Sequence, residues 1–137
     1  MGLWIQISSG SDEPIYVQVA EQISEAIAKG QLATGDKLPA VRKLAAELVI
    51  NPNTVARAYS RLEQAGLVTT KTGSGTFISD PKLRSGDAAD INILTERMDT
   101  LITRGLNLGL EGRDLIAMFK TRLAGFANKS KSRKKKK

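Results

Sequence analysis

The sequence of 137 residues contains no cysteine and no histidine, and only 4% of its residues are aromatic. Disulfides, zinc knuckles and thiol chemistry are thereby excluded, together with the commonest metal ligand and the usual general base near neutral pH. So few aromatic side chains argue against stacking platforms for single-stranded nucleic acid. No apolar run approaches the roughly 18 residues of a membrane span, and no secretory signal is visible. We therefore expect a cytoplasmic protein that is not an enzyme, crosses no membrane and needs no metal or cofactor.

Positive charge is concentrated at the C-terminal end. The net charge is +7, and the segment 129–137 alone carries seven positive charges and no acid, so that the remainder is formally neutral. The high isoelectric point therefore does not by itself indicate a nucleic-acid partner. We expect residues 129–137 to form a disordered basic tail. This tail could attract phosphates non-specifically, serve only as a solubilising end, or have been added during cloning.

Apolar periodicity and turn residues predict three helices after a short strand at residues 3–7. Pro14 suits the start of the first helix and Gly30 its C-terminal cap, and Pro39 marks the start of the second. The third starts at Asn51-Pro52, because asparagine is a good N-cap and proline a good first helical residue. Two helices joined by so short a turn must cross steeply, which is the helix-turn-helix arrangement.

Residues 67–79 predict a β-hairpin with glycines in its turn. No Gly-Lys-Ser/Thr sequence and no helix follows the turn, so a nucleotide-binding loop is excluded. As a wing, the turn would let the backbone approach a DNA groove or a phosphate; the alternative is a plain tight turn. We expect an α+β, mostly α fold, with a winged helix-turn-helix domain over 1–80 and a linker over 81–87.

Residues 88–128 predict a hairpin of two amphipathic helices separated by residues 105–112. A lone hairpin cannot bury both apolar stripes, so we expect them to form a dimer interface. The alternative is that these helices fold back onto the winged domain of their own chain. The apolar stripes consist of Ile91, Leu94, Met98, Leu101, Ile102, Leu115, Phe119, Leu123 and Phe126.

The third predicted helix carries a candidate DNA-binding face. Asn53, Arg57 and Arg61 recur at i, i+4 and i+8, away from the predicted buried stripe, and Thr54 lies beside them. Asparagine can pair with adenine, arginine with guanine or phosphate, and threonine with phosphate or a thymine methyl group. A solvated helix surface is the alternative, because exposed arginine is common on helices.

The local charge balance favours the DNA interpretation. From residue 37 to residue 82 there are seven basic groups and three acidic ones, whereas residues 14–36 carry one basic and three acidic groups. A phosphate-facing surface requires such a gathering of positive charge. Arg42 and Lys43 could anchor phosphates or simply be solvated. The candidate DNA-binding residues are Arg42, Lys43, Asn53, Thr54, Arg57, Arg61, Lys71, Gly73, Ser74 and Gly75.

Several short motifs follow one another along residues 3–80. They are Pro14-Ile15-Tyr16-Val17-Gln18, Gly30-Gln31-Leu32, Gly35-Asp36-Lys37-Leu38-Pro39, Arg42-Lys43-Leu44-Ala45, Asn51-Pro52-Asn53-Thr54-Val55, Ala58-Tyr59, Leu62-Glu63, Gly66-Leu67-Val68 and Gly73-Ser74-Gly75-Thr76-Phe77. In this order they resemble the winged helix of the GntR family. The short two-helix C-terminal part is similar to the YtrA subfamily, whose members use such a region to dimerise.

The resemblance implies a bacterial transcription factor, usually a repressor, that binds a pseudo-palindromic operator in double-stranded DNA as a homodimer. YtrA-like members commonly control transporter operons. By this resemblance the DNA contacts map onto Arg42, Asn53, Thr54 and Gly73. Many relatives place an arginine at the position of Ala56, which can make no side-chain hydrogen bond here. This departure shifts the expected base contacts towards Arg57 and Arg61.

A different class of function remains as the alternative. Winged helices also serve as protein-interaction adaptors, and such a protein would have only non-specific affinity for nucleic acid, through its basic tail. The basic face of the third helix argues against it. No residue identifies a small-molecule effector, and the short C-terminal hairpin leaves little volume for an effector pocket.

Overall fold

The computed structural model describes residues 5–81 and 88–135, with side chains through residue 126. The chain divides into two compact units, Met1–Arg84 and Ser85–Lys137. The predicted linker at 81–87 lies outside the described residues except for its first residue, and so do residues 3 and 4 of the predicted strand.

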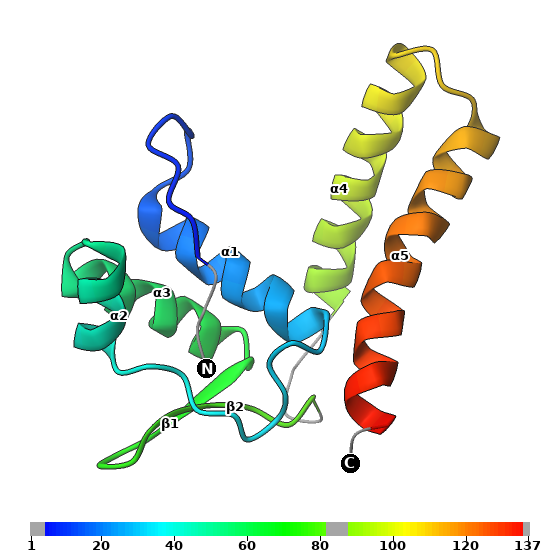
Figure 1. The fold of residues 1–137 in the computed structure, drawn as a ribbon. Helices are drawn as coiled ribbons and strands as arrows, with labels where there is room; N and C mark the ends of the chain where they lie inside the picture. The colour runs from blue at the N-terminus through cyan, green and yellow to red at the C-terminus, as the bar shows by residue number, and fades with distance from the viewer. Residues whose placement is uncertain (1–4, 82–87, 136–137) are drawn as a thin grey trace. The chain divides into compact units, whose positions relative to one another are not determined.

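The first unit contains three helices and a two-stranded antiparallel sheet (Figure 1). Their bounds are α1 (Ile15–Ala28), α2 (Val41–Leu48), α3 (Pro52–Gln64), β1 (Val68–Lys71) and β2 (Gly75–Ile78). The register pairs Val68 with Ile78 and Lys71 with Gly75. The predicted helix-turn-helix and hairpin are therefore confirmed.

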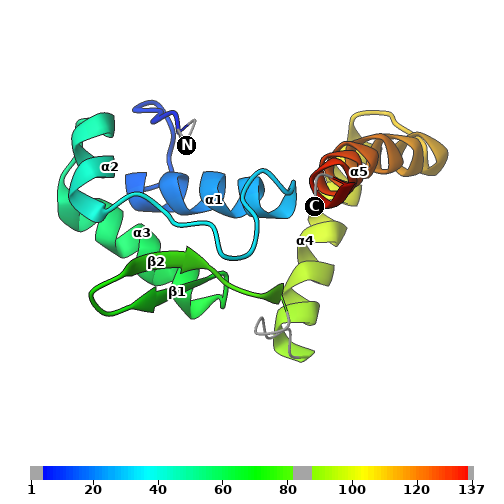
Figure 2. The same ribbon diagram turned by 60° about the horizontal axis from the view of Figure 1, so that its bottom comes forward.

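The connector between α1 and α2 forms an extended edge beside β2, as Figure 2 shows. The amide of Leu38 donates to the carbonyl oxygen of Thr76 over 2.8 Å, and the amide of Ile78 donates to that of Asp36 over 2.9 Å. The sequence pattern predicts this segment only as a connector. This extended segment lies beside the hairpin and fixes the position of the Lys37 backbone next to Phe77 of β2.

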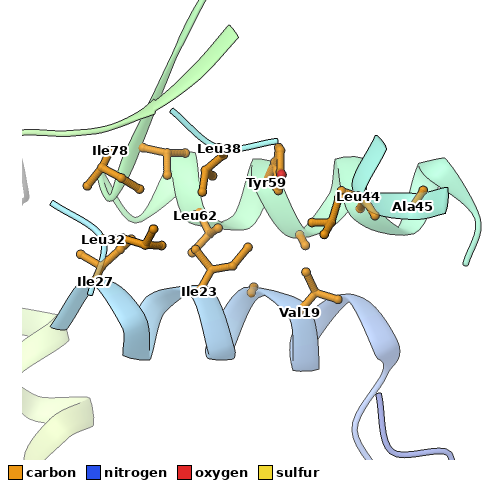
Figure 3. Packing of buried hydrophobic residues seen from close by; sticks show 14 residues of the cluster. Val19, Ile23, Ile27, Leu32, Leu38, Leu44, Ala45, Tyr59, Leu62 and Ile78 are labelled. Carbon is orange, nitrogen blue, oxygen red and sulfur yellow. The ribbon is translucent and has the colours of Figure 1, made fainter. Parts of the chain in front are cut away.

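The core of the first unit lies between α1, α3 and the hairpin (Figure 3). Ile23 of α1 and Leu62 of α3 face each other at its centre. The buried apolar residues are Val19, Ala20, Ile23, Ile27, Leu32, Leu38, Leu44, Ala45, Val55, Ala58, Tyr59, Leu62, Val68 and Ile78. Because this single core holds α3 on several sides, the outward face of α3 is fixed relative to α1.

The helix ends follow from local chemistry. Asn51 caps α3, since its Oδ1 accepts the amide of Asn53 over 2.8 Å, and Pro52 begins the helix as predicted. Gly30 follows α1 with a φ of 78°, the left-handed region that glycine adopts most easily. Pro14 lies one residue before α1 and serves as its N-cap, rather than being its first residue.

The predicted strand at 3–7 does not form in the described residues 5–7. Two glutamine side chains of α1 take the place of a neighbouring strand. The side-chain amide of Gln22 accepts the amide of Gln6 over 3.0 Å and donates to its carbonyl oxygen over 2.8 Å. Gln18 binds the backbone of Ser8 in the same two ways. The apolar side chains at 5 and 7 then pack against the core without any sheet.

The second unit is a helical hairpin of α4 (Ala88–Asn107) and α5 (Gly112–Lys135) (Figure 1). Gly105 of α4 is buried against Leu115 of α5. The close approach requires glycine, because a Cβ at this position would clash with Cδ2 of Leu115. Asp114 caps the start of α5 by accepting the amide of Glu111 over 2.8 Å. The helix continues to Lys135, so it includes most of the basic segment for which the sequence predicts disorder.

Candidate nucleic-acid interface

The exposed face of α3 borders a shallow groove of about 610 Å³. Its lining residues are Tyr16 from α1 and Asn53, Ala56, Arg57, Ser60, Arg61 and Gln64 from α3. The lining contains two guanidinium groups, two amides and two hydroxyl groups, and no carboxylate among the described residues. Such a surface offers many hydrogen-bond donors to phosphates and to the acceptor-rich edges of base pairs.

Arg57 is held by an aromatic ring from the neighbouring helix. Its Cζ atom lies 4.1 Å from the centroid of the Tyr16 ring, a separation typical of a cation–π stack. Tyr16 itself is half-buried, between the core and the groove. The Tyr16 ring of α1 thus lies against the guanidinium group of Arg57 on α3.

The hairpin turn needs its glycines for two reasons. Gly73 has a φ of 81° and Gly75 a φ of 125°, values that L-residues rarely adopt. In addition, a Cβ at Gly75 would lie 2.7 Å from Cε of Lys37, so a larger residue would displace that lysine. Lys71, at the base of the turn, has its Nζ 5.2 Å from the centroid of the Phe77 ring. Lys37 and Lys71 therefore lie on the same face of the hairpin, because they pair with Phe77 and Gly75, which alternate onto one face of β2.

Two side-chain contacts hold α3 to the rest of the interface. The Tyr59 hydroxyl donates to the Pro39 carbonyl oxygen over 2.7 Å, which ties α3 to the residues before α2. Burial raises the pKa of Tyr59 well above its usual range, and the nearby charge of Glu47 raises it further. At the other end, Oε2 of Glu63 accepts the amide of Thr70 over 3.3 Å. The contacts fix α3 relative to both α2 and the wing.

The predicted DNA-binding residues fall into three groups. Asn53, Arg57 and Arg61 lie together in the groove, while Thr54 is half-buried beside it. The second group lies on the hairpin and consists of Lys71, Gly73, Ser74 and Gly75. The third group, Arg42 and Lys43, is exposed on α2 and does not line the groove.

The groove and the wing also include residues that the sequence pattern does not predict for this site. Ser60 and Gln64 follow Asn53 at i+7 and i+11, so extending the helical spacing would have found them. Tyr16, Ala20, Ile23 and Ile27 recur at i, i+4, i+7 and i+11, so their spacing predicts Tyr16 as part of the core stripe of the first helix. Lys37 belongs to a motif that carries the family resemblance, but only the fold brings it to the wing.

The predicted dimer residues lie on α4 and α5. Leu115 and Phe126 are half-buried within the single chain. The other seven are exposed, with fractions from 41% for Met98 to 64% for Leu101. The apolar surface of the hairpin is also wider than predicted, because Ile93, Leu106, Leu108, Ile116 and Met118 are exposed as well.

The described residues offer neither a metal cluster nor a membrane-spanning helix. No cluster of three or more acidic, histidine or cysteine side chains that could hold a metal ion occurs among them. None of the helices in that part of the chain combines the length and the apolar character needed to cross a bilayer.

Comparison with known proteins identifies the family. Residues 15–78 match the family described as "Bacterial regulatory proteins, gntR family". The HTH-type transcriptional repressor YtrA of Bacillus subtilis (strain 168) is 39% identical over 107 residues, which are 78% of this chain and 82% of that protein.

Solved structures agree with the fold. A transcriptional antiterminator from Listeria monocytogenes EGD-e superposes with a TM-score of 0.76 at 28% identity, over 85% of this chain and 87% of that one. AraR(DBD) in complex with operator ORX1 has a TM-score of 0.51 at 27% identity, over 58% of this chain and 99% of that one. The predicted α+β, mostly α class is confirmed. The chain belongs to the YtrA-like subfamily of the GntR family and is a DNA-binding transcriptional regulator, not an enzyme.

Proposed function

We propose that the protein is a repressor that binds a pseudo-palindromic operator as a homodimer, with α3 in the major groove and the hairpin as a wing. The observation that carries this proposal is the face of α3, which is rich in donors, lacks carboxylates among its described lining residues and is held rigidly by the core. A rigid helix that presents such side chains is what base readout in the major groove requires.

The side chains divide into base-reading and phosphate-binding groups. Asn53, Arg57 and Arg61 line the groove on α3 and would reach base edges. Lys37 and Lys71 lie on one face of the hairpin, against Gly75 and Phe77, and their ammonium groups would bind backbone phosphates there. Arg42 and Lys43, exposed on α2, join them as phosphate anchors that set the register of the protein on the duplex.

The apolar hairpin supports the dimer. Leu101 is 64% exposed and Phe119 57% exposed in the single chain, and several further large apolar side chains of α4 and α5 are equally open. Contiguous apolar surface of this kind usually marks an interface. A second copy would cover the same surface on each protomer by two-fold symmetry. The two recognition helices would then meet successive major grooves, about 34 Å apart.

Repression and the regulated genes are the finer part of the proposal. The relative from Bacillus subtilis is named a repressor, and a dimer seated on an operator would repress by occupying DNA that the transcription machinery needs. We propose a transporter operon as the regulated unit, as the subfamily resemblance implies. The protein would work in the cytoplasm, where bacterial DNA is found.

Selection of random duplex DNA tests the proposal. The full chain and a chain ending at residue 128 are each used to enrich duplexes at near-physiological salt, and the enriched pools are sequenced. We expect both to recover the same pseudo-palindrome, with half-sites about one helical turn apart. Sedimentation of the full chain, alone and with the selected duplex, should give two protomers per duplex.

The adaptor alternative gives a different outcome in the same experiment. An adaptor that meets DNA only through its basic segment would enrich no motif, because phosphate contacts carry no sequence information. Its binding would fall steeply with salt and would disappear when residues 129–137 are removed. Those two results together would refute sequence-specific binding and favour the adaptor hypothesis.

A further inference from the structure

We infer that Tyr16 is a positioning residue for operator recognition, which holds the guanidinium group of Arg57 in the orientation that DNA binding uses. The inference rests on the proposed function and deepens it, since it names a residue of α1 as a determinant of readout by α3. Tyr16 need not touch a base for this effect; it acts through the side chain that does.

The geometry places the two side chains as a stacked pair. The Cζ of Arg57 lies 4.1 Å from the Tyr16 ring centroid, and both residues line the groove. Tyr16 is half-buried at the start of α1, whose next turn contributes Val19 and Ala20 to the core. The ring is therefore anchored on one side, while its other side supports the arginine.

A stacked guanidinium keeps its hydrogen-bonding edge available. The five N–H donors of arginine lie in the plane of the group, so an aromatic ring against its face leaves them free to form bidentate hydrogen bonds. The described lining of the groove offers no carboxylate to compete for these donors. The stack thus leaves Arg57 ready for an acceptor from outside the protein.

The stack also reduces the cost of ordering a long side chain on binding. An arginine that moves freely in the unbound protein loses conformational entropy when DNA fixes it, and that loss weakens affinity. Tyr16 restricts Arg57 before DNA arrives, so a smaller loss remains. We expect removal of the ring to weaken operator binding about three- to tenfold, which is the size of effect expected for one side chain of this kind.

The test compares Tyr16→Leu with Tyr16→Phe in the full chain. The dissociation constant is measured for the duplex obtained by selection and for an unrelated duplex of the same length. We expect Tyr16→Leu to raise the dissociation constant for the operator duplex three- to tenfold. The dissociation constant for the unrelated duplex should not change. Tyr16→Phe, which keeps the ring, should stay within twofold of the parent. A loss in Tyr16→Phe equal to that in Tyr16→Leu would assign the effect to the hydroxyl group and overturn the inference.

A double-mutant cycle separates positioning from a role in folding. In the Arg57→Ala background, Tyr16→Leu should cause no further loss of operator binding, because the side chain it positions is absent. An equal loss in both backgrounds would mean that Tyr16 acts without Arg57 and would overturn the inference. If Arg57→Ala weakens binding and Tyr16→Leu does not, only the inference fails. If Arg57→Ala has no effect, the assignment of the α3 face fails with it.

A measurement on the free parent protein keeps the inference testable if Tyr16→Leu does not fold. Protons of the Arg57 side chain that lie over an aromatic ring resonate upfield of their usual position. We expect this shift in the nuclear magnetic resonance spectrum of the parent and of Tyr16→Phe, with Arg57→Ala used to assign the signals. Unshifted Arg57 signals in the parent would show that the stack is not populated in solution and would overturn the inference.

Discussion

Val49 adopts an unfavourable backbone conformation in the turn between α2 and α3, and replacing it should stabilise the protein. Its φ is 56° and its ψ is 52°, which lie in the left-handed region. Among the described residues other than glycine, Val49 alone has a positive φ. For a β-branched residue this region is a genuine outlier, because its Cβ approaches the backbone too closely. The turn needs the conformation, since it lets the amide of Ile50 donate to the carbonyl oxygen of Ala45 over 3.0 Å.

The size of the effect follows from three contributions. Relief of the left-handed conformation by glycine is worth about 1–2 kcal/mol. Against this, glycine makes the unfolded chain more flexible, which costs about 0.4–1 kcal/mol. The side chain of Val49 is 87% exposed, so its removal gives up almost no buried surface. Val49→Gly should therefore raise the free energy of unfolding by about 0.5–1 kcal/mol, or roughly 2–8 °C in melting temperature for a unit of this size.

Thermal unfolding followed by circular dichroism, at one fixed protein concentration, measures this change. Val49→Ala is the matched control: it removes most of the side chain but retains a Cβ in the left-handed region, so it should gain less than glycine. Operator affinity should be unchanged in both variants, because Val49 does not line the groove. A melting temperature of Val49→Gly at or below that of Val49→Ala would refute the reasoning.

Three further substitutions test other parts of the structure. Arg57→Ala should weaken operator binding by about 1–3 kcal/mol, measured by titration, whereas Arg113→Ala, an equal loss of charge on α5, should leave it unchanged. Leu101→Glu should convert the proposed dimer into a monomer in sedimentation experiments, because dimerisation would bury a charge, and Thr121→Glu should not. Gly75→Ala should lower the melting temperature, at a cost of about 1–3 kcal/mol, since alanine is strained at a φ of 125°. An unchanged melting temperature for Gly75→Ala would contradict the described turn.

The parts of the fold that the sequence predicted correctly depend on local chemistry. Asn51 and Pro52 identify the start of α3 because a cap and a first-turn proline act within a few residues. Gly30 identifies the end of α1 in the same way. The spacing of Asn53, Arg57 and Arg61 places them on one face, since helical periodicity depends on no distant residue.

The features that the sequence did not predict depend on contacts between distant segments. The apolar run at 3–7 has the composition of a strand, but the backbone near it is hydrogen-bonded by side chains of α1. Gln22 binds the backbone of Gln6, sixteen residues earlier, and Gln18 binds that of Ser8. Lys37 joins the wing because its backbone runs beside β2. Val49 gave no signal, because valine is among the least expected residues in the left-handed region.

Tyr16 shows why periodicity identifies a core stripe more reliably than its two ends. The predicted stripe of α1 contains Ala20, Ile23 and Ile27, which are buried, and Tyr16, which is only half-buried. Tyr16 lies at the N-terminal end of this stripe, where it packs against the core and also lines the groove on α3. In this fold α3 presents Arg57 to the ring. An aromatic residue at such a position therefore links the stability of the domain to the geometry of its binding face, and sequence spacing alone assigns it to the first role only.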